Sequence, residues 1–334
     1  MKYAICLAGN IVVDSIKYIS EYPNKLELTP ILRMERSLGG AVPNVGLDLA
    51  RLAPDLPLKC VGFAGADDNG AYALEVMRRC PSLDLSDVKR ASVNSFTDVM
   101  TVEATGERTF FTFKGADSLL TSDTVPVDRL DCDIFHIGYA LLLDGLDQPD
   151  AEYGTAMARV LAAVQARGIR TSLDVVSENS DRYARIVPPA LKYTDYFSVN
   201  ETEAERTTGV PLTRDGRLLR ENLRPALERL KAMGVRRWAV IHTPALSCGL
   251  DEENRYAEAG TLCLPDGFVK GSVGAGDAFT AGLLLRAWQN APLHDALETA
   301  NAAAALSLST PGATEGMKTL EETLAFAAKY QKRT

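Results

Sequence analysis

The chain has 334 residues, of which 46% are hydrophobic and 24% are charged, and its formal net charge at pH 7 is −8. This composition is typical of a globular protein with one large α/β domain or two small ones, and it excludes an extended disordered chain. The acidic balance gives no sign of a surface for nucleic acid or for anionic membranes, so we expect neither as a partner.

The six cysteines are dispersed, form no C-x-x-C pair, and have no histidine at metal-ligand spacing. We therefore expect reduced thiols. The apolar run near the start, Tyr3–Ala8, is too short for the hydrophobic region of a signal peptide. No apolar stretch approaches the ~20 residues of a membrane span. These features predict a cytoplasmic protein.

Short apolar runs with strand character recur along the chain, and longer helical patterns separate most of them. The runs are Tyr3–Ala8, Leu58–Ala64, Ile134–Gly138, Arg170–Asp174, Tyr196–Val199 and Trp238–His242. Apolar strands that alternate with helices predict a parallel sheet covered on both faces. Ligands of such sheets gather at the carboxyl ends of the strands.

One segment interrupts this alternation. Residues 97–103 and 108–113 flank the turn Ala104–Glu107, which is the pattern of a β-hairpin. With residues 14–38, this hairpin is expected to form a small sheet over the mouth of the main one. An ordinary edge hairpin is the alternative.

Two short motifs place polar groups after the first strand. A carboxylate at Asp14 can accept hydrogen bonds from two neighbouring hydroxyls of a sugar. Gly39 and Gly40 permit close approach of a ligand, and the amide of Asn44, ahead of a helix expected over 45–52, both donates and accepts. Each motif alone is also compatible with a turn or a helix start.

The stretch Gly274-Ala275-Gly276-Asp277 runs into a strongly apolar segment and predicts an anion cradle. The glycines let backbone N–H groups converge, and the helix that begins there adds the positive end of its dipole. Asp277, in the first helical turn, is expected to be ionised near neutral pH and to serve as a general base. An ordinary capping Asp after a Gly-rich turn is the alternative. The stretch is neither a Walker loop nor a dinucleotide fingerprint.

The run Gly274-Ala275-Gly276-Asp277-Ala278-Phe279 resembles the second signature of the ribokinase-like (phosphofructokinase-B type) carbohydrate kinases. Gly39, Gly40 and Asn44 resemble the first signature, and the matching motifs follow family order over about residues 9–316. The resemblance implies a ribokinase-like three-layer α/β fold with a central, mostly parallel sheet. It also implies one domain over residues 1–334, with lid segments at about 14–38 and 95–116.

The same resemblance implies ATP-dependent phosphorylation of a hydroxyl of a sugar or nucleoside, with Mg²⁺. Asn200 and Glu203 match an Asn-x-x-Glu motif and, at i and i+3 of one helix face, can hold a hydrated magnesium near the triphosphate. The implied roles are catalysis for Asp277, Gly274, Ala275 and Gly276; acceptor binding for Asp14, Gly39, Gly40 and Asn44; nucleotide binding for Asn200, Gly276 and Asn301; and magnesium for Glu203.

The chain departs from the family pattern at three places. Ala41-Val42-Pro43 stands where relatives that act on phosphorylated sugars have Lys-Gly, so we expect an unphosphorylated acceptor. Gly271 stands where many relatives have an Asp of the monovalent-cation site, so we expect weak or no activation by potassium. Residues 242–249 replace a Thr-x-Gly-x-x-Gly nucleotide loop, so purine recognition there must be rebuilt.

Two other functions stay open. A sugar- or nucleoside-binding protein that has lost turnover is favoured by Gly271 and the altered loop, and disfavoured by the intact Asp277. A nicotinamide-dependent dehydrogenase would fit the α/β pattern, but the chain lacks the glycine fingerprint of that class after the first strand.

Phe110, Phe111 and Phe113 in the lid offer apolar surface and strand edges, which predict a homodimer through the lid.

Overall fold

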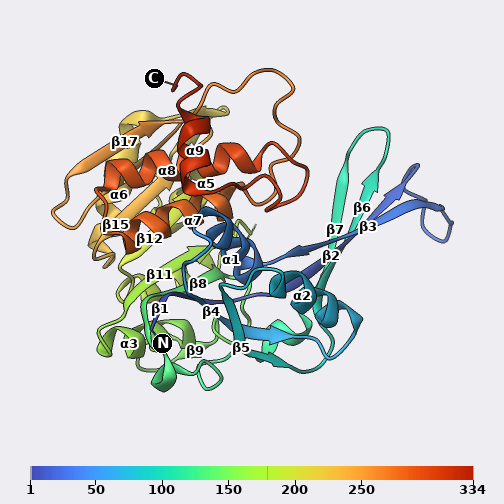
Figure 1. The fold of residues 1–334 in the computed structure, drawn as a ribbon, viewed down its shortest axis with the longest axis horizontal. Coiled ribbons are helices and arrows are strands. Elements are labelled where there is room, and N and C mark those ends of the chain that lie inside the picture. Colours follow the sequence, from blue (N-terminus) through green and yellow to red (C-terminus); the bar gives the residue numbers. More distant parts are fainter. Residues whose placement is uncertain (1, 179, 334) are drawn as a thin grey trace.

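The computed structural model describes residues 2–178 and 180–333. Its main sheet has nine strands in the order β17-β16-β15-β12-β11-β8-β1-β4-β5 (Figure 1). The strands are β1 Tyr3–Ala8, β4 Leu58–Ala64, β5 Leu83–Arg90, β8 Cys132–Ala140, β11 Arg170–Val175, β12 Tyr196–Asn200, β15 Trp238–His242, β16 Leu246–Leu250 and β17 Tyr256–Gly260. The pairs are parallel except at one edge, where β15, β16 and β17 run antiparallel. The expected mostly parallel sheet is confirmed.

Consecutive residues of the central strands enter opposite hydrophobic layers. In β1, Ile5 and Leu7 pack into one buried cluster, while Cys6 and Ala8 pack into the other. Side chains of a strand alternate between its two faces, so a strand that is buried on both faces must be apolar throughout.

Helices cover both faces of the sheet and give the three layers visible in Figure 1. One face carries α1 Ala41–Leu52, α2 Asp68–Arg78, α7 Ala275–Trp288 and α8 Leu293–Ser307, with α9 Leu320–Ala327 against α8. The other face carries α3 Ala156–Ala166, α4 Tyr183–Leu191, α5 Glu201–Thr208 and α6 Leu223–Ala232. Short elements complete the chain: β9 Pro149–Asp150, β10 Gly154–Thr155, β13 Thr213–Arg214, β14 Arg217–Leu218 and the 3₁₀ turns Gly115–Leu119, Val127–Arg129 and Arg220–Asn222. Within the described ranges, no helix is both long and apolar enough to cross a bilayer.

Helix α1 begins at Ala41, so the expected start at residue 45 was wrong. Gly40 precedes it in the left-handed region, with a φ of 95°, and a Cβ there would stand 2.6 Å from the carbonyl oxygen of Asn10. Pro43 is tolerated in the first turn because its missing N–H would have no helical partner there. Asn44 therefore projects from α1 itself and not from the preceding loop.

A second sheet of four strands, the lid sheet, projects from the body beside α1 and α2 (Figure 1). Its order is β3-β2-β6-β7, with β2 Val12–Ile19, β3 Ile31–Gly39, β6 Ser95–Val102 and β7 Arg108–Phe113. The pairs β2–β3 and β6–β7 are antiparallel hairpins, and a parallel pairing of β2 with β6 joins them. The hairpin predicted around 104–107 is confirmed.

Candidate active site

The amino end of α7 forms an open cradle of backbone N–H groups. Gly274 precedes the helix in the left-handed region, with a φ of 78°, and a Cβ there would stand 2.6 Å from the carbonyl oxygen of Ala313. No described side chain caps this helix, and a Cβ at Gly276 would meet no described atom within 4 Å. The space in front of the N–H groups of Gly276 and Asp277 is therefore open to an anion. The N–H of Ala275 points back toward the carbonyl of Ser272, 3.4 Å away, and is less available.

Asp277 lies in the first turn of α7 and is only 5% exposed. Its Oδ2 accepts from the amide nitrogen of Asn44 at 2.9 Å, and the Tyr139 hydroxyl lies 3.0 Å from Oδ1 and 2.8 Å from Oδ2. Burial raises the pKa of Asp277 to about 6, against the opposing effect of the hydrogen bonds from Tyr139 and Asn44. The carboxylate is thus largely ionised at neutral pH and close to the value that suits a general base.

Asn44 connects the first signature to the second. Its Nδ2 is used by Asp277, whereas its Oδ1 is buried with no hydrogen-bond partner in the described part of the chain. A buried amide oxygen without a partner is unfavourable unless a ligand or water donates to it. A hydroxyl group bound next to Asp277 would supply that donor.

Asp14 lies on strand β2 of the lid sheet, paired in register with Ser37 and Thr97. A Cβ at Gly39 would stand 2.9 Å from its Oδ2, so the glycine makes room for the carboxylate. Burial raises the pKa of Asp14 to about 6, and a hydrogen bond from Thr97 opposes this. A hydrogen bond joins Asn44 to Asp277, whereas Asp14 lies beside Gly39, in the segment that precedes α1.

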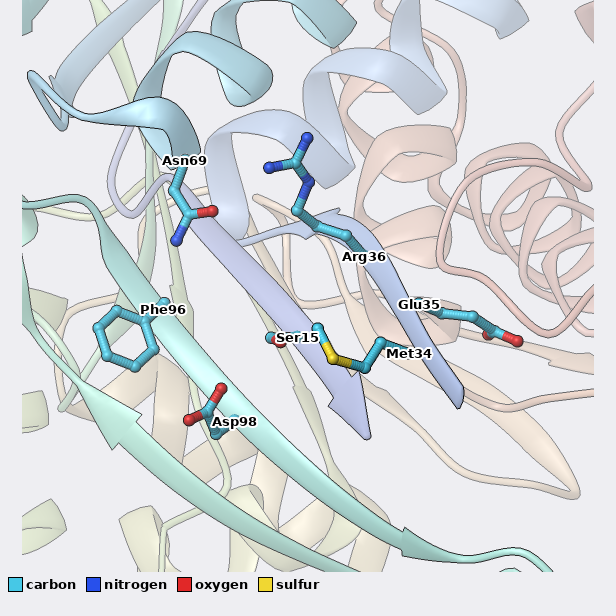
Figure 2. A pocket seen from close by; sticks show the side chains of 7 residues that line it. All are labelled: Ser15, Met34, Glu35, Arg36, Asn69, Phe96 and Asp98. Atoms are coloured by element: carbon cyan, nitrogen blue, oxygen red, sulfur yellow. The ribbon is translucent and has the colours of Figure 1, made fainter. Parts of the chain in front are cut away.

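The lid sheet also carries a hollow of about 470 Å³ (Figure 2). It is lined by Ser15, Met34, Glu35, Arg36, Asn69, Phe96 and Asp98. Neighbouring residues of a strand point to opposite faces, so Ser15 and Asp14 lie on different sides of the sheet. This hollow is therefore separate from the predicted acceptor residues.

Asn200 and Glu203 come together in a reciprocal capping box at the start of α5. The Oε2 of Glu203 accepts from the Asn200 N–H at 2.9 Å, and its Oε1 accepts from the Ser177 hydroxyl at 2.6 Å. Burial raises the pKa of Glu203, and the bonds from Ser177 and Asn200 oppose this. Asp174, at the end of β11, has a pKa raised well above its ordinary value by burial, and then by the negative charges of Glu203 and Asp277.

These buried acids fit a cation bound nearby, because a positive charge would relieve their mutual repulsion. Among residues 2–178 and 180–333, no group of three or more acidic, His or Cys side chains is arranged to hold a metal ion directly. The donor set therefore fits a hydrated magnesium, which keeps several waters and takes phosphate oxygens as ligands, and not an ion in a protein cage.

The residues expected near the nucleotide base are tied into the fold. Asn301 lies on α8, where its Nδ2 donates to the carbonyls of Ala259 at 3.0 Å and Gly260 at 3.3 Å. In the altered loop after β15, the Thr243 hydroxyl oxygen accepts from the Leu246 N–H at 3.1 Å and closes a tight turn. A nucleotide role for Asn301 stays a prediction, and its amide nitrogen already has protein partners.

Sequence reasoning missed Tyr139, Asp48 and Asp174. Tyr139 and Asp174 lie at the carboxyl ends of predicted strands, and this position was the available signal. Asp48 lies one turn after Asn44 on α1, fully buried, and both of its oxygens have no partner among the described residues. Burial, followed by the charge of Asp277, raises the pKa of Asp48 well above its ordinary value.

A sequence model described as pfkB family carbohydrate kinase matches residues 5–320. The aminoimidazole riboside kinase of Salmonella typhimurium is 25% identical over 289 residues, covering 82% of this chain and 83% of that protein. The 2-dehydro-3-deoxygluconokinase of Bacillus subtilis is 24% identical over 324 residues, covering 92% and 91%. The ribokinase of Arabidopsis thaliana, solved in complex with ribose and ATP, superposes with a TM-score of 0.80 at 21% identity, covering 98% and 99% of the two chains. The ribokinase-like fold expected from the signatures is confirmed.

Proposed function

Since this chain belongs to the pfkB family of carbohydrate kinases, we propose that it transfers the γ-phosphoryl group of ATP to a hydroxyl of an unphosphorylated sugar or nucleoside. The acceptor oxygen bonds to the γ-phosphorus while the bond from phosphorus to the bridging oxygen of ADP breaks. The acceptor proton passes to Asp277. The observation that carries this proposal is the buried carboxylate of Asp277 beside an open, uncapped helix start.

Each part of the cradle has a role in this reaction. The N–H groups of Gly276 and Asp277 stabilise negative charge on the transferring group, as preorganised donors do in a water-poor site. Asn44 holds Asp277 through its Nδ2 and receives the acceptor through its free Oδ1. Bound Mg²⁺ would neutralise charge on the phosphates, with Glu203 and Asn200 holding its water shell.

Residues Ala41 and Val42 of the first signature favour an acceptor without a phosphate. Ala41 and Val42, which stand in place of a Lys-Gly pair, are buried and apolar, so they offer no cation to a substrate phosphate. Asp14 and the Oδ1 of Asn44 accept hydrogen bonds, as recognition of hydroxyl groups requires. A nucleoside is the second candidate, and a riboside kinase at 25% identity supports it.

The test is a screen of pentoses, hexoses, sugar acids and nucleosides with MgATP, followed by ADP release. The Asp277→Asn variant is assayed in parallel. Phosphorylated sugars are included as acceptors for which no turnover is expected. We expect turnover with at least one unphosphorylated acceptor and a large loss in the variant. Thermal stabilisation by an acceptor without ADP release would instead identify a binding protein.

Potassium should activate this enzyme weakly or not at all. A side chain at Gly271 would meet the carbonyl oxygens of Pro311 at 2.9 Å and Thr310 at 3.0 Å, so the position holds no carboxylate and has no room for one. Without that charge, a weakly held cation loses a major attraction. The measurement is initial rate against potassium at constant ionic strength, with a bulky organic cation as replacement. A saturable rise of about tenfold would contradict the expectation, because ordinary ionic-strength effects are held fixed.

We also propose a homodimer formed through the lid sheet, in the cytoplasm. Phe111 and Phe113 are more than two-fifths exposed and lie on the lid face that holds the hollow of Figure 2. A second copy would cover these exposed aromatic rings. The six free cysteines suit a reducing compartment.

A further inference from the structure

Tyr139 stands at the carboxyl end of β8 in an unusual backbone conformation. Its φ is 63°, and that of Leu141, two residues on, is 79°. Bulky residues rarely adopt the left-handed region, and strain of this kind concentrates at functional sites. The hydroxyl that this conformation directs inward lies within 3.0 Å of both oxygens of Asp277.

An ion pair between half-buried Arg182 and buried Asp147 holds the strained turn. The Leu141 N–H donates to Oδ1 of Asp147 at 3.1 Å, and the Leu141 carbonyl accepts from the Arg182 guanidinium at 3.0 Å. Arg182 and Asp147 bond to each other at 2.8 Å, and Asp147 is only 7% exposed. Both backbone groups of Leu141 are thus hydrogen-bonded, and these bonds support the turn that carries Tyr139.

The other groups around Asp277 come from α1 and β11. Helix α1 contributes Asn44, which donates to Asp277, and Asp48, whose pKa is raised by burial and then by the charge of Asp277. Strand β11 contributes Asp174, whose pKa is raised by burial and then by the charges of Glu203 and Asp277. Within its own helix, Asp277 is the acidic residue of the first turn. Among the described residues, Tyr139 and Asn44 are thus the side chains that donate to the base, and their hydrogen bonds oppose the effect of its burial.

We propose that Tyr139 is a positioning residue of the transfer reaction, whose hydroxyl holds the Asp277 carboxylate in place and ionised before the acceptor arrives. The inference rests on the proposed role of Asp277 as the base. The acceptor hydroxyl then donates to the carboxylate oxygen that remains accessible, and its proton moves to Asp277. Tyr139 keeps its own proton, because burial and the charge of Asp277 raise its pKa well above the ordinary value.

The test is the pH profile of kcat/KM for Tyr139→Phe, since this ratio reports the free enzyme. Loss of a hydrogen bond to the charged form moves the acid limb toward higher pH, by about one unit for a bond of ordinary strength. The variant should therefore lose about fivefold more activity near pH 6 than near pH 8. The matched control is Tyr196→Phe. Tyr196 is also buried, but its hydroxyl accepts from Arg170 at 3.0 Å and has no bond to Asp277.

A superimposable profile, a loss that is uniform with pH, or faster turnover in Tyr139→Phe would overturn the inference. If the variant does not fold, Asp147→Asn carries the test. It removes the charge that pairs with Arg182 and so weakens the support of the turn, while the chain keeps Tyr139 itself. Its acid limb should move in the same direction, and an unmoved limb contradicts the proposal. An inactive wild type, or an Asp277→Asn enzyme with the wild-type rate, would refute the proposed function instead.

Discussion

Asp277 is a residue where folding and catalysis make opposite demands. Its pKa of about 6 in the folded protein lies above the ordinary 3.8. A group with a raised folded pKa stabilises the fold most below its unfolded pKa, and this stabilisation is lost as pH rises through the folded value. The site therefore carries its base at a cost in stability, which is fully present above about pH 6.

Asp277→Asn should accordingly lower kcat by roughly 10²- to 10⁴-fold and stabilise the fold at alkaline pH. We expect a gain in the free energy of unfolding on the order of 2 kcal/mol near pH 8, and little gain near pH 4. Urea unfolding at both pH values, with kcat measured at the higher one, checks the prediction. Equal free energies of unfolding for the two proteins at both pH values would show that the buried, ionised Asp277 does not destabilise the fold.

The acceptor residues should separate from the nucleotide residues in kinetics. Asp14→Ala should raise the acceptor KM by about tenfold or more with little change in the ATP KM, since it leaves a buried hydroxyl without a partner. Asn44→Ala should do the same and also lower kcat, because Asp277 loses a donor. Asn69→Ala, in the hollow on the lid sheet, is the matched control and should change neither KM. Variants that weakened only ATP would reverse the assignment.

At this scale, the sequence pointed to single residues but not to their contacts. Asp277 and Asn44 were recognisable from their glycine-rich motifs, yet their hydrogen bond joins residues that are 233 positions apart. The bond from Tyr139 to Asp277 spans 138 positions and depends on the turn after β8. Such contacts follow from strand order and packing, which local patterns do not encode.

At the scale of elements, helices α5 and α9 both begin with a capping box, but their surroundings differ. Asn200 and Glu203 form a capping box on α5 beside the buried acids, and Thr319 and Glu322 form one on α9 away from them. Asn200→Ala and Thr319→Ala should each cost about 1 kcal/mol of stability. We expect only Asn200→Ala to raise the KM for MgATP. Equal KM values in the two variants would remove the magnesium role from this motif.

The strands show which elements a sequence can reveal. Tyr3–Ala8, Leu58–Ala64 and Trp238–His242 were predicted with their observed ends, because burial on both faces makes a strand apolar throughout. The edge strand β5, Leu83–Arg90, was missed since five of its eight side chains are polar and three of these are exposed. The start of α1 at Ala41 was missed, and Pro43 lies within its first turn.

At the scale of the whole molecule, the lid sheet should decide the oligomeric state. Phe111→Glu places a charge among its exposed aromatic rings and should turn a dimer into a monomer in light scattering at micromolar concentration. Leu324→Glu, on the exposed side of α9, is the control and should remain dimeric. A wild type that scatters as one chain at that concentration would count against pairing through the lid.

The parallel pairing of β2 with β6 in the lid sheet also bears on how the protein folds. Residues 12–19 pair with residues 95–102, and α1, β4, α2 and β5 lie between them in the chain. Contacts so distant in sequence close late, since the intervening chain must first be ordered. The two hairpins can form early, but β2 can pair with β6 only after the intervening elements have docked. During this interval β2 and β6 each present an unpaired edge, so the lid sheet is the part of the molecule most prone to misassembly during refolding.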